Sequence, residues 1–180
     1  MNIFEQNPII AAIRSREDFE IALSSPVNNI FLLSCNIMTV SDYIERAKEK
    51  GKRLFVHLDM VDGLGKDSFG VEFIAGKAPY GIISTRGNTI KTAKSFGLVT
   101  VERFFMIDGQ SVETAVETVR NNKPSYVEIM PGVIPKLVKR FSDSGIHVIA
   151  GGLISAENEA YDALKAGALA ISTSHRDFWR

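Results

Sequence analysis

One stretch of the chain has the composition of an anion-binding loop. A short apolar run at residues 147–150 leads into two glycines, Gly151 and Gly152, and Ser155 follows as the expected N-cap of a helix. A junction of this kind leaves several main-chain N–H groups without partners, and the helix dipole adds to their attraction for an anion. The spacing therefore predicts a phosphate-binding loop, although a glycine pair by itself is more often only a turn.

A second polar loop supports this interpretation. The sequence ALAISTS ends a predicted strand with Ser172, Thr173 and Ser174. Many β/α barrels bind phosphate between the loops that follow two consecutive late strands. We therefore expect Gly151, Gly152 and these three hydroxyl residues to surround a phosphate group.

Charged residues on predicted strands form a second candidate group. Glu128 lies near the end of one strand, Arg103 lies in the strand before it, and Asp59 ends an earlier strand that also carries His57. A buried charge is costly unless it is paired or hydrogen-bonded, so Arg103 either forms a structural ion pair with Glu128 or contacts a ligand. For Glu128 and Asp59 the favoured role is to accept hydrogen bonds from vicinal hydroxyls of a ligand. His57 is expected to be a core histidine.

The familiar catalytic and metal-binding signatures are missing. The chain has no HExxH, CxxC, GxSxG or Walker A motif, and its 3 histidines are scattered. Neither a histidine-based triad nor a metal site is therefore expected. Asp59 and Glu128 could act as an acid and a base, but nothing else in the sequence indicates that they do. The chain is predicted not to be an enzyme and to need no cofactor.

The elements that carry these residues alternate between strand and helix. Such alternation predicts parallel β/α units, and eight of them fit a compact, closed (β/α)8 TIM-like barrel. An open doubly wound sheet is the alternative, but the paired phosphate loops favour the barrel. A typical barrel needs roughly 250 residues, so the last helix must be truncated to little more than residues 175–180. The expected strands span residues 9–13, 30–34, 54–59, 81–85, 100–108, 126–130, 147–150 and 170–173, and the expected helices span residues 18–24, 41–50, 68–76, 88–96, 111–119 and 155–165, with one more from Pro135 that Gly145 ends.

The composition fits one globular domain over residues 1–180. Hydrophobic residues make up 45% of the chain, and 21 basic side chains balance 21 acidic ones, so strong unspecific attraction to nucleic acid is not expected. The single cysteine, Cys35, excludes an internal disulfide and is typical of a reducing cytoplasm. The N-terminus has no basic region and no long apolar run, so we expect no signal peptide and no membrane partner.

Taken together, the motifs resemble one protein family. The runs PIIAAIRS, FVHLDMVDGL, GIISTR, TVERFFMID, VEIMPGVIPK, VIAGGLI and ISTSHRDFW occur in this order along the chain. The series is similar to the pattern of the glycerol-3-phosphate-responsive antiterminators and covers nearly the whole chain. Glu102 and Arg86 are mild departures, because glutamine and lysine are more expected there.

The resemblance implies a TIM-barrel-like cytoplasmic regulator. It implies that the protein senses glycerol 3-phosphate at the C-terminal face of the barrel and binds the leader mRNA of glycerol genes, which prevents premature transcription termination. The glycine loop, Thr173 and Ser174 would then hold the phosphate, and Glu128, Asp59 and Arg103 would read the glycerol hydroxyls. The cations that would balance the charge of the ligand or close the mouth are Arg14, Arg86 and Lys66.

Contacts with RNA are indicated less clearly. Lys136, Lys139 and Arg140 fall on one predicted helix, where they could contact RNA phosphates, but solvated barrel helices look the same. The alternative function is an enzyme that acts on a small phosphorylated polyol. The barrel is also similar to that of prenylglyceryl phosphate synthases, which share a Tyr-x-Glu like Tyr126 and Glu128. A ligand-independent scaffold is a third hypothesis, and assembly into a homo-oligomer stays open.

Overall fold

The computed structural model describes residues 3–180, and its elements lie close to those expected from the sequence. The segments expected at residues 9–13, 68–76, 126–130 and 170–173 match residue for residue. The main strands are β1 (Ile9–Ile13), β2 (Asn29–Leu32), β4 (Arg53–His57), β6 (Gly81–Ser84), β7 (Val99–Phe105), β8 (Tyr126–Met130), β9 (Val148–Gly151) and β10 (Ala170–Thr173). The α-helices are α1 (Arg16–Ser24), α2 (Val40–Glu49), α3 (Ser68–Gly76), α4 (Gly87–Ser95), α5 (Gly109–Asn122), α6 (Pro135–Asp143) and α7 (Glu157–Lys165).

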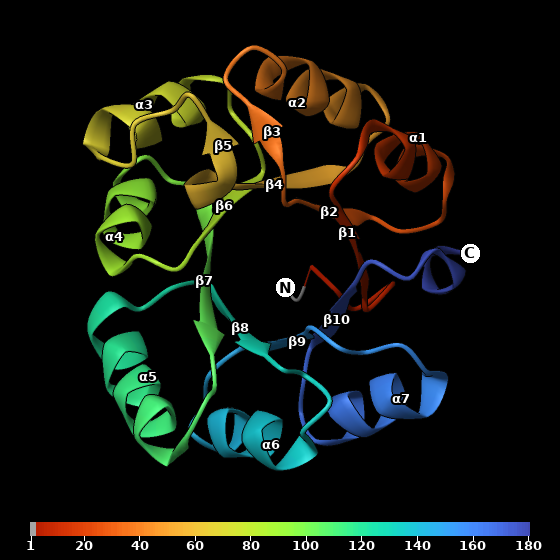
Figure 1. Ribbon diagram of the computed structural model, residues 1–180, viewed down its shortest axis with the longest axis vertical. Helices are drawn as coiled ribbons and strands as arrows, with labels where there is room; N and C mark the ends of the chain where they lie inside the picture. Colours follow the sequence, from red (N-terminus) through yellow and green to blue (C-terminus); the bar gives the residue numbers. More distant parts are fainter. Residues whose placement is uncertain (1–2) are drawn as a thin grey trace.

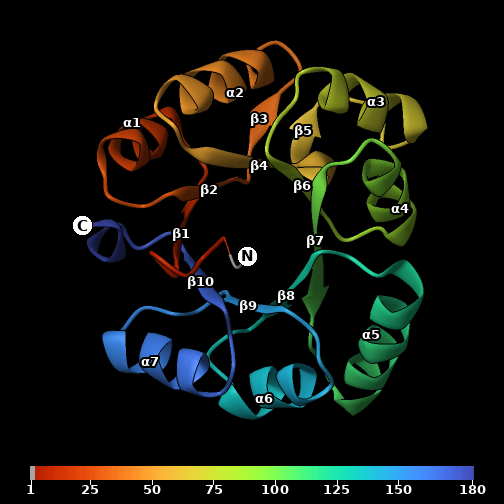
Figure 2. The same ribbon diagram turned by 180° about the vertical axis from the view of Figure 1, so that it is seen from behind.

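The main strands form a closed parallel barrel. Around the barrel they follow the order β1, β2, β4, β6, β7, β8, β9 and β10, and β10 pairs with β1 to close the ring. Figures 1 and 2 show the helices in an outer ring around the strands. The predicted (β/α)8 barrel is confirmed, and the open sheet is wrong. A small parallel pair, β3 (Cys35–Asn36) with β5 (Val61–Asp62), was not expected from the sequence.

The N-terminal segment closes one end of the barrel. Phe4 is 1% exposed and packs edge-on against Tyr126, with ring centroids 5.0 Å apart. The main-chain oxygen of Ile3 accepts a hydrogen bond from Arg53 at 2.9 Å. Because Tyr126 and Arg53 are the first residues of their strands, this segment covers the N-terminal ends of the strands. Both views show the described segment before β1 reaching toward the centre of the ring (Figures 1 and 2). This segment does not cover the C-terminal ends of the strands.

The eighth helix of the barrel is reduced to a single short turn. This turn, η2 (Arg176–Trp179), contains the fully buried Trp179, whose indole N–H donates to the main-chain oxygen of Thr173 at 3.1 Å. The truncated last helix expected from the chain length is thus confirmed, and Trp179 packs in the core cluster between the barrel and its helices. None of the helices in residues 3–180 is both long enough and apolar enough to cross a membrane.

Several expected boundaries are shifted by a few residues, and three of the shifts move a residue that the sequence had placed at a strand end or a helix cap. Strand β4 ends at His57, and Asp59 lies in the short turn η1 (Leu58–Met60). Strand β7 ends at Phe105, and Asp108 instead caps α5. Ser155 is not the N-cap of α7: the cap is Ala156, and the side chain of Glu159 reaches back to accept from the main-chain N–H groups of both residues, at 2.8 and 3.0 Å.

Candidate ligand-binding site

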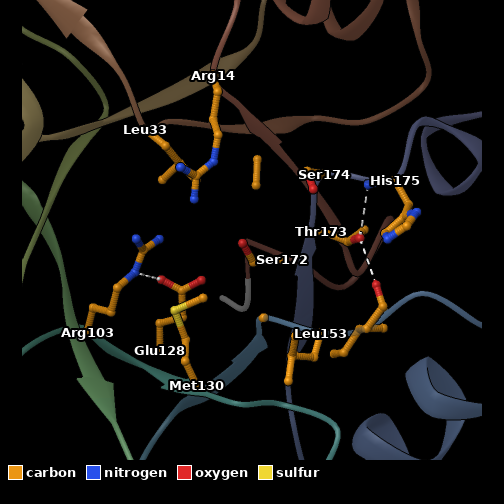
Figure 3. Close-up of a pocket in the computed structure, with 13 residues that line it drawn as sticks. Arg14, Leu33, Arg103, Glu128, Met130, Leu153, Ser172, Thr173, Ser174 and His175 are labelled. Carbon is orange, nitrogen blue, oxygen red and sulfur yellow. Dashed lines mark hydrogen bonds and ion pairs between the residues drawn. The ribbon is translucent and has the colours of Figure 1, made fainter.

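A cavity of about 190 Å³ opens at the C-terminal end of the barrel (Figure 3). It lies between the end of β1, the inner faces of β7 and β8, and the loops that follow β9 and β10. Pockets for drug-sized molecules usually measure roughly 300–1,000 Å³, so this cavity fits a small metabolite. The predicted site residues that line it are Arg14, Arg103, Glu128, Gly152, Ser172, Thr173 and Ser174.

The inner wall of the cavity contains a buried ion pair. Arg103 and Glu128 are register partners on β7 and β8, and the Nε of Arg103 lies 2.6 Å from the Oε2 of Glu128. Their side chains are only 7% and 0% exposed. The second oxygen of Glu128, Oε1, and the Nη2 of Arg103 are buried and have no hydrogen-bond partner in the described part of the chain. The predicted pairing is confirmed, and both side chains keep hydrogen-bonding capacity at the cavity.

The two glycines after β9 are required by the backbone and by close packing. A Cβ on Gly151 would lie 2.4 Å from the Oε1 of Glu128, so only glycine leaves room for that carboxylate. Gly152 has a φ of +75°, and the next residue, Leu153, also has a positive φ of 61° although its side chain disfavours it. Strained backbone of this kind is often found at binding sites. The main-chain N–H groups of Gly152, Leu153 and Ser174 have no acceptor within residues 3–180.

The hydroxyl residues after β10 serve two different purposes. The hydroxyl of Thr173 donates to the main-chain oxygen of Ile154 at 3.1 Å and accepts from the N–H of His175 at 3.2 Å. Thr173 therefore joins the two late loops through its side chain. Ser172 is only 4% exposed, lines the cavity and makes no side-chain hydrogen bond to another described residue, so its hydroxyl is available. Ser174 lies at the exposed edge of the same cavity.

A single arginine supplies unpaired positive charge at the mouth. Arg14 follows β1, and Figure 3 shows its side chain pointing into the cavity, on the side opposite Leu153. Its guanidinium forms neither an ion pair nor a hydrogen bond with residues 3–180. The charges of Arg103 and Glu128 offset one another, so Arg14 gives the cavity a net positive charge. This arrangement attracts an anion to the mouth rather than to the inner wall.

Other predicted site residues lie outside the cavity. Asp59 accepts hydrogen bonds from the hydroxyl of Ser84 at 2.9 Å and from the N–H of Thr85 at 2.7 Å. Arg86 is 3.8 Å from the same carboxylate. Lys66 donates to the main-chain oxygens of Leu58 and Val61, at 3.0 and 2.6 Å. These three residues brace the loops after β4 and β6.

His57 is buried in the barrel and does not line the cavity. It is 4% exposed, and burial together with the charge of Arg103 lowers the pKa of His57 from 6.5 to about 4. The imidazole is therefore neutral at neutral pH. Its Nδ1 lies 4.0 Å from Asp59, too far for a hydrogen bond. The expectation of a core histidine is confirmed, although its Nδ1 has no partner among the described residues.

Sequence reasoning missed the apolar part of the lining. Ala12 lies in β1, Leu33 directly follows β2 and Met130 ends β8, whereas Leu153 and Ile154 come from the glycine loop. Apolar strand residues look alike in the sequence whether they line a cavity or fill a core, so only the chain positions next to polar tips could have suggested them.

The predicted RNA contacts lie on α6, in the outer ring of helices, and none of them lines the cavity. Lys139 forms an ion pair with Asp143 at 2.9 Å, and Arg140 pairs with Glu113 on α5. Both charges are thus partly offset on this surface. Lys136 joins them along a groove of about 660 Å³ between α5 and α6. Within residues 3–180 no group of His, Cys, Asp and Glu side chains is arranged to hold a metal ion.

Fold and cavity together define a minimal TIM-barrel protein with a small, positively charged pocket over its last two strands. The chain belongs to the family of glycerol-3-phosphate responsive antiterminators, whose family model matches residues 9–179. The expectation drawn from the sequence motifs is therefore confirmed at the level of the family.

Relatives resemble the chain along nearly its whole length. Protein YgcP of Escherichia coli K12 is 31% identical over 181 residues, which cover 99% of this chain and 95% of YgcP. The crystal structure of the glycerol uptake operon antiterminator regulatory protein of Listeria monocytogenes is 32% identical with a TM-score of 0.95, and the match covers 98% of this chain and 97% of that one. A glycerol uptake operon antiterminator-related protein of Thermotoga maritima is 33% identical with a TM-score of 0.86 and coverages of 95% and 96%.

Proposed function

We propose that the protein is a cytoplasmic transcription antitermination regulator of glycerol metabolism genes that binds glycerol 3-phosphate in the cavity and leader mRNA on its outer surface. Family membership supports the regulatory role. The observation that carries the ligand is the division of the cavity into a cationic mouth, at Arg14, and an inner wall where Glu128 and Arg103 have unpartnered polar atoms. A phosphate fits the first and hydroxyls fit the second.

In this arrangement the phosphate lies between Arg14 and the N–H groups of Gly152, Leu153 and Ser174. Orphan main-chain N–H groups beside a cation are a recurrent phosphate site. The glycerol end points inward, where a hydroxyl donates to the Oε1 of Glu128. Arg86, Lys66 and Asp59 act on the ligand only indirectly, through the loops they hold.

Calorimetry with glycerol 3-phosphate tests this site. The Gly152→Asp variant places a carboxylate beside the phosphate, and two like charges 4 Å apart repel by about 4 kcal/mol at an effective dielectric of 20. We expect affinity to fall more than a hundredfold. Gly145→Asp is the matched control, because Gly145 has the same φ of +75° and a Cβ added there would have no atom within 4 Å. Equal affinity in both variants would refute the site, and no saturable binding by the unaltered protein would support a ligand-independent scaffold.

RNA binding requires its own experiment. A gel shift of the candidate leader RNA, with and without glycerol 3-phosphate and over a salt series, measures both the interaction and its dependence on the ligand. Replacing Lys136, Lys139 and Arg140 together by glutamine should weaken binding and flatten the salt dependence if α6 contacts phosphates. An unchanged salt dependence would indicate that RNA binds to a surface other than α6. Sedimentation of the same samples reports whether a homo-oligomer forms.

The alternative, an enzyme acting on a phosphorylated polyol, receives less support from the cavity. Glu128 is the single carboxylate in its lining, since Asp59 is held by Ser84 and Thr85. An acid and base pair of these two residues is therefore not assembled. Phosphorus NMR of the protein with glycerol phosphates and prenyl diphosphates decides the matter: turnover that disappears in Glu128→Gln would favour the enzyme.

A further inference from the structure

The charges around the cavity are distributed unevenly from mouth to inner wall. Figure 3 shows Arg14 on one side of the cavity and the Arg103–Glu128 pair on another. Because the Nε of Arg103 is already 2.6 Å from the Oε2 of Glu128, the positive charge of Arg103 is offset by its partner. The Oε1 of Glu128 remains unpartnered and buried. The inner wall thus presents a negative oxygen and no uncompensated cation.

The groups behind the inner wall add no positive charge to it. His57 is neutral at neutral pH, since burial and Arg103 lower its pKa to about 4. Asp59, whose Oδ2 is 4.0 Å from the Nδ1 of His57, is an acidic side chain. Ser172 contributes only a hydroxyl. Any second negative charge that a phosphorylated ligand carries at its inner end therefore meets the unpartnered oxygen of Glu128 beside a guanidinium whose charge is already offset by its pairing with Glu128.

We propose that Glu128 is a charge filter that restricts the cavity to phosphorylated alcohols and excludes phosphorylated carboxylic acids with the same carbon skeleton. This inference rests on the proposed ligand site. A hydroxyl can donate to the Oε1 of Glu128 and accept from the Nη2 of Arg103 at once. A carboxylate at the same place can only accept, so it satisfies Arg103 but repels Glu128. A like charge that opposes the wrong ligand is an effective means of discrimination.

The size of the effect follows from the geometry. A ligand carboxylate within hydrogen-bonding reach of the pair lies about 4 Å from Oε1, where like charges at an effective dielectric of 20 repel strongly enough to weaken binding by about a thousandfold. Attraction of the extra negative charge to Arg103, which its pairing with Glu128 reduces, and to Arg14, which solvent at the mouth reduces, acts in the opposite direction. We therefore expect a net preference for the alcohol of at least a hundredfold.

Calorimetry with two ligands tests the filter on the unaltered protein. Glycerol 3-phosphate and 3-phosphoglycerate share a three-carbon skeleton and differ only at the carbon farthest from the phosphate, which is a hydroxymethyl group in the first and a carboxylate in the second. We expect glycerol 3-phosphate to bind at least a hundredfold more tightly. The methyl ester of 3-phosphoglycerate, which lacks the second charge, should recover at least tenfold of the loss. Equal affinity for the alcohol and the acid, or no recovery by the ester, would overturn the inference.

A variant gives the complementary test from the side of the protein. Glu128→Gln keeps nearly the same side-chain shape, removes the negative charge and leaves Arg103 free to pair with a ligand carboxylate. The variant should therefore bind 3-phosphoglycerate more tightly, and the preference for glycerol 3-phosphate over 3-phosphoglycerate should shrink at least tenfold. Glu102→Gln is the matched control. Glu102, on β7, is a fully buried carboxylate like Glu128, but it accepts a hydrogen bond from Asn122 at 2.6 Å and does not line the cavity. An identical shift in both variants would contradict a specific role for Glu128.

The outcomes also separate this inference from the proposed function. Binding of glycerol 3-phosphate without discrimination would leave the ligand site standing and refute the filter alone. If neither phosphate binds the unaltered protein, the proposed ligand site is refuted and the filter with it. Because the comparison of three ligands needs no substitution, the inference is decided even if Glu128→Gln does not fold.

Discussion

Replacing Gly151 by alanine tests how tightly the inner wall of the cavity is packed. A Cβ at this position would lie 2.4 Å from the Oε1 of Glu128 and 3.1 Å from its Cδ. The carboxylate must therefore move. It has little freedom to do so, because Glu128 is 0% exposed and its Oε2 lies 2.6 Å from the Nε of Arg103. The strain of one added methyl group is thus transferred to a buried ion pair.

The expected cost has two parts. An extra carbon in a closed core typically costs about 1–3 kcal/mol, and complete loss of one partner of a buried ion pair costs about 3–5 kcal/mol. The carboxylate is displaced but not removed, so only part of the second cost applies. We expect Gly151→Ala to lower the free energy of unfolding by about 2–4 kcal/mol. Urea denaturation followed by circular dichroism measures this change.

Two comparisons make the result decisive. Gly76→Ala is the control, because no atom lies within 4 Å of a Cβ there, and alanine at this helix position should be neutral or stabilise by up to about 1 kcal/mol. In a Glu128→Ala background the clash disappears, so Gly151→Ala should then cost less than about 1 kcal/mol. A loss below about 0.5 kcal/mol in the natural background, or the same loss in both backgrounds, would refute the reasoning.

Three further predictions concern residues around the cavity. The folded protein holds the pKa of His57 at about 4, below its ordinary 6.5, so the unfolded chain takes up a proton first as the pH falls. The free energy of unfolding should therefore fall by up to about 3 kcal/mol between pH 6.5 and 4. Urea titrations should show that the His57→Gln variant lacks this loss, and a variant with the same pH profile as the unaltered protein would contradict the prediction. Asp59→Asn weakens the hydrogen bonds from Ser84 and Thr85, so it should lower the free energy of unfolding by about 1–3 kcal/mol. Calorimetry should show nearly unchanged affinity for glycerol 3-phosphate, and a large loss of affinity would place Asp59 in the site. Arg14→Gln should leave the melting temperature unchanged and weaken binding by roughly tenfold or more, so unchanged affinity would remove Arg14 from the phosphate site.

The sequence determined the architecture of this protein because the relevant signals are local. Alternating strand and helix patterns needed only neighbouring residues to predict a parallel barrel, and the chain length required the last helix to shrink to the turn that contains Trp179. Gly151 and Gly152 were identified by type, since a left-handed backbone and a close approach both favour glycine. The pairing of Arg103 with Glu128 followed from their places on neighbouring strands.

Only the tertiary structure decided which polar strand ends meet. Asp59 looked equivalent to Glu128 in the sequence, but the chain turns after β4 and hydroxyl and N–H donors from the end of β6 occupy its carboxylate. Thr173 likewise uses its hydroxyl to join two loops. Competition among donors for one acceptor depends on strand register and on distances between segments far apart in the chain. Residue type and spacing along the sequence contain neither quantity, which is why the barrel could be predicted and the membership of its cavity could not.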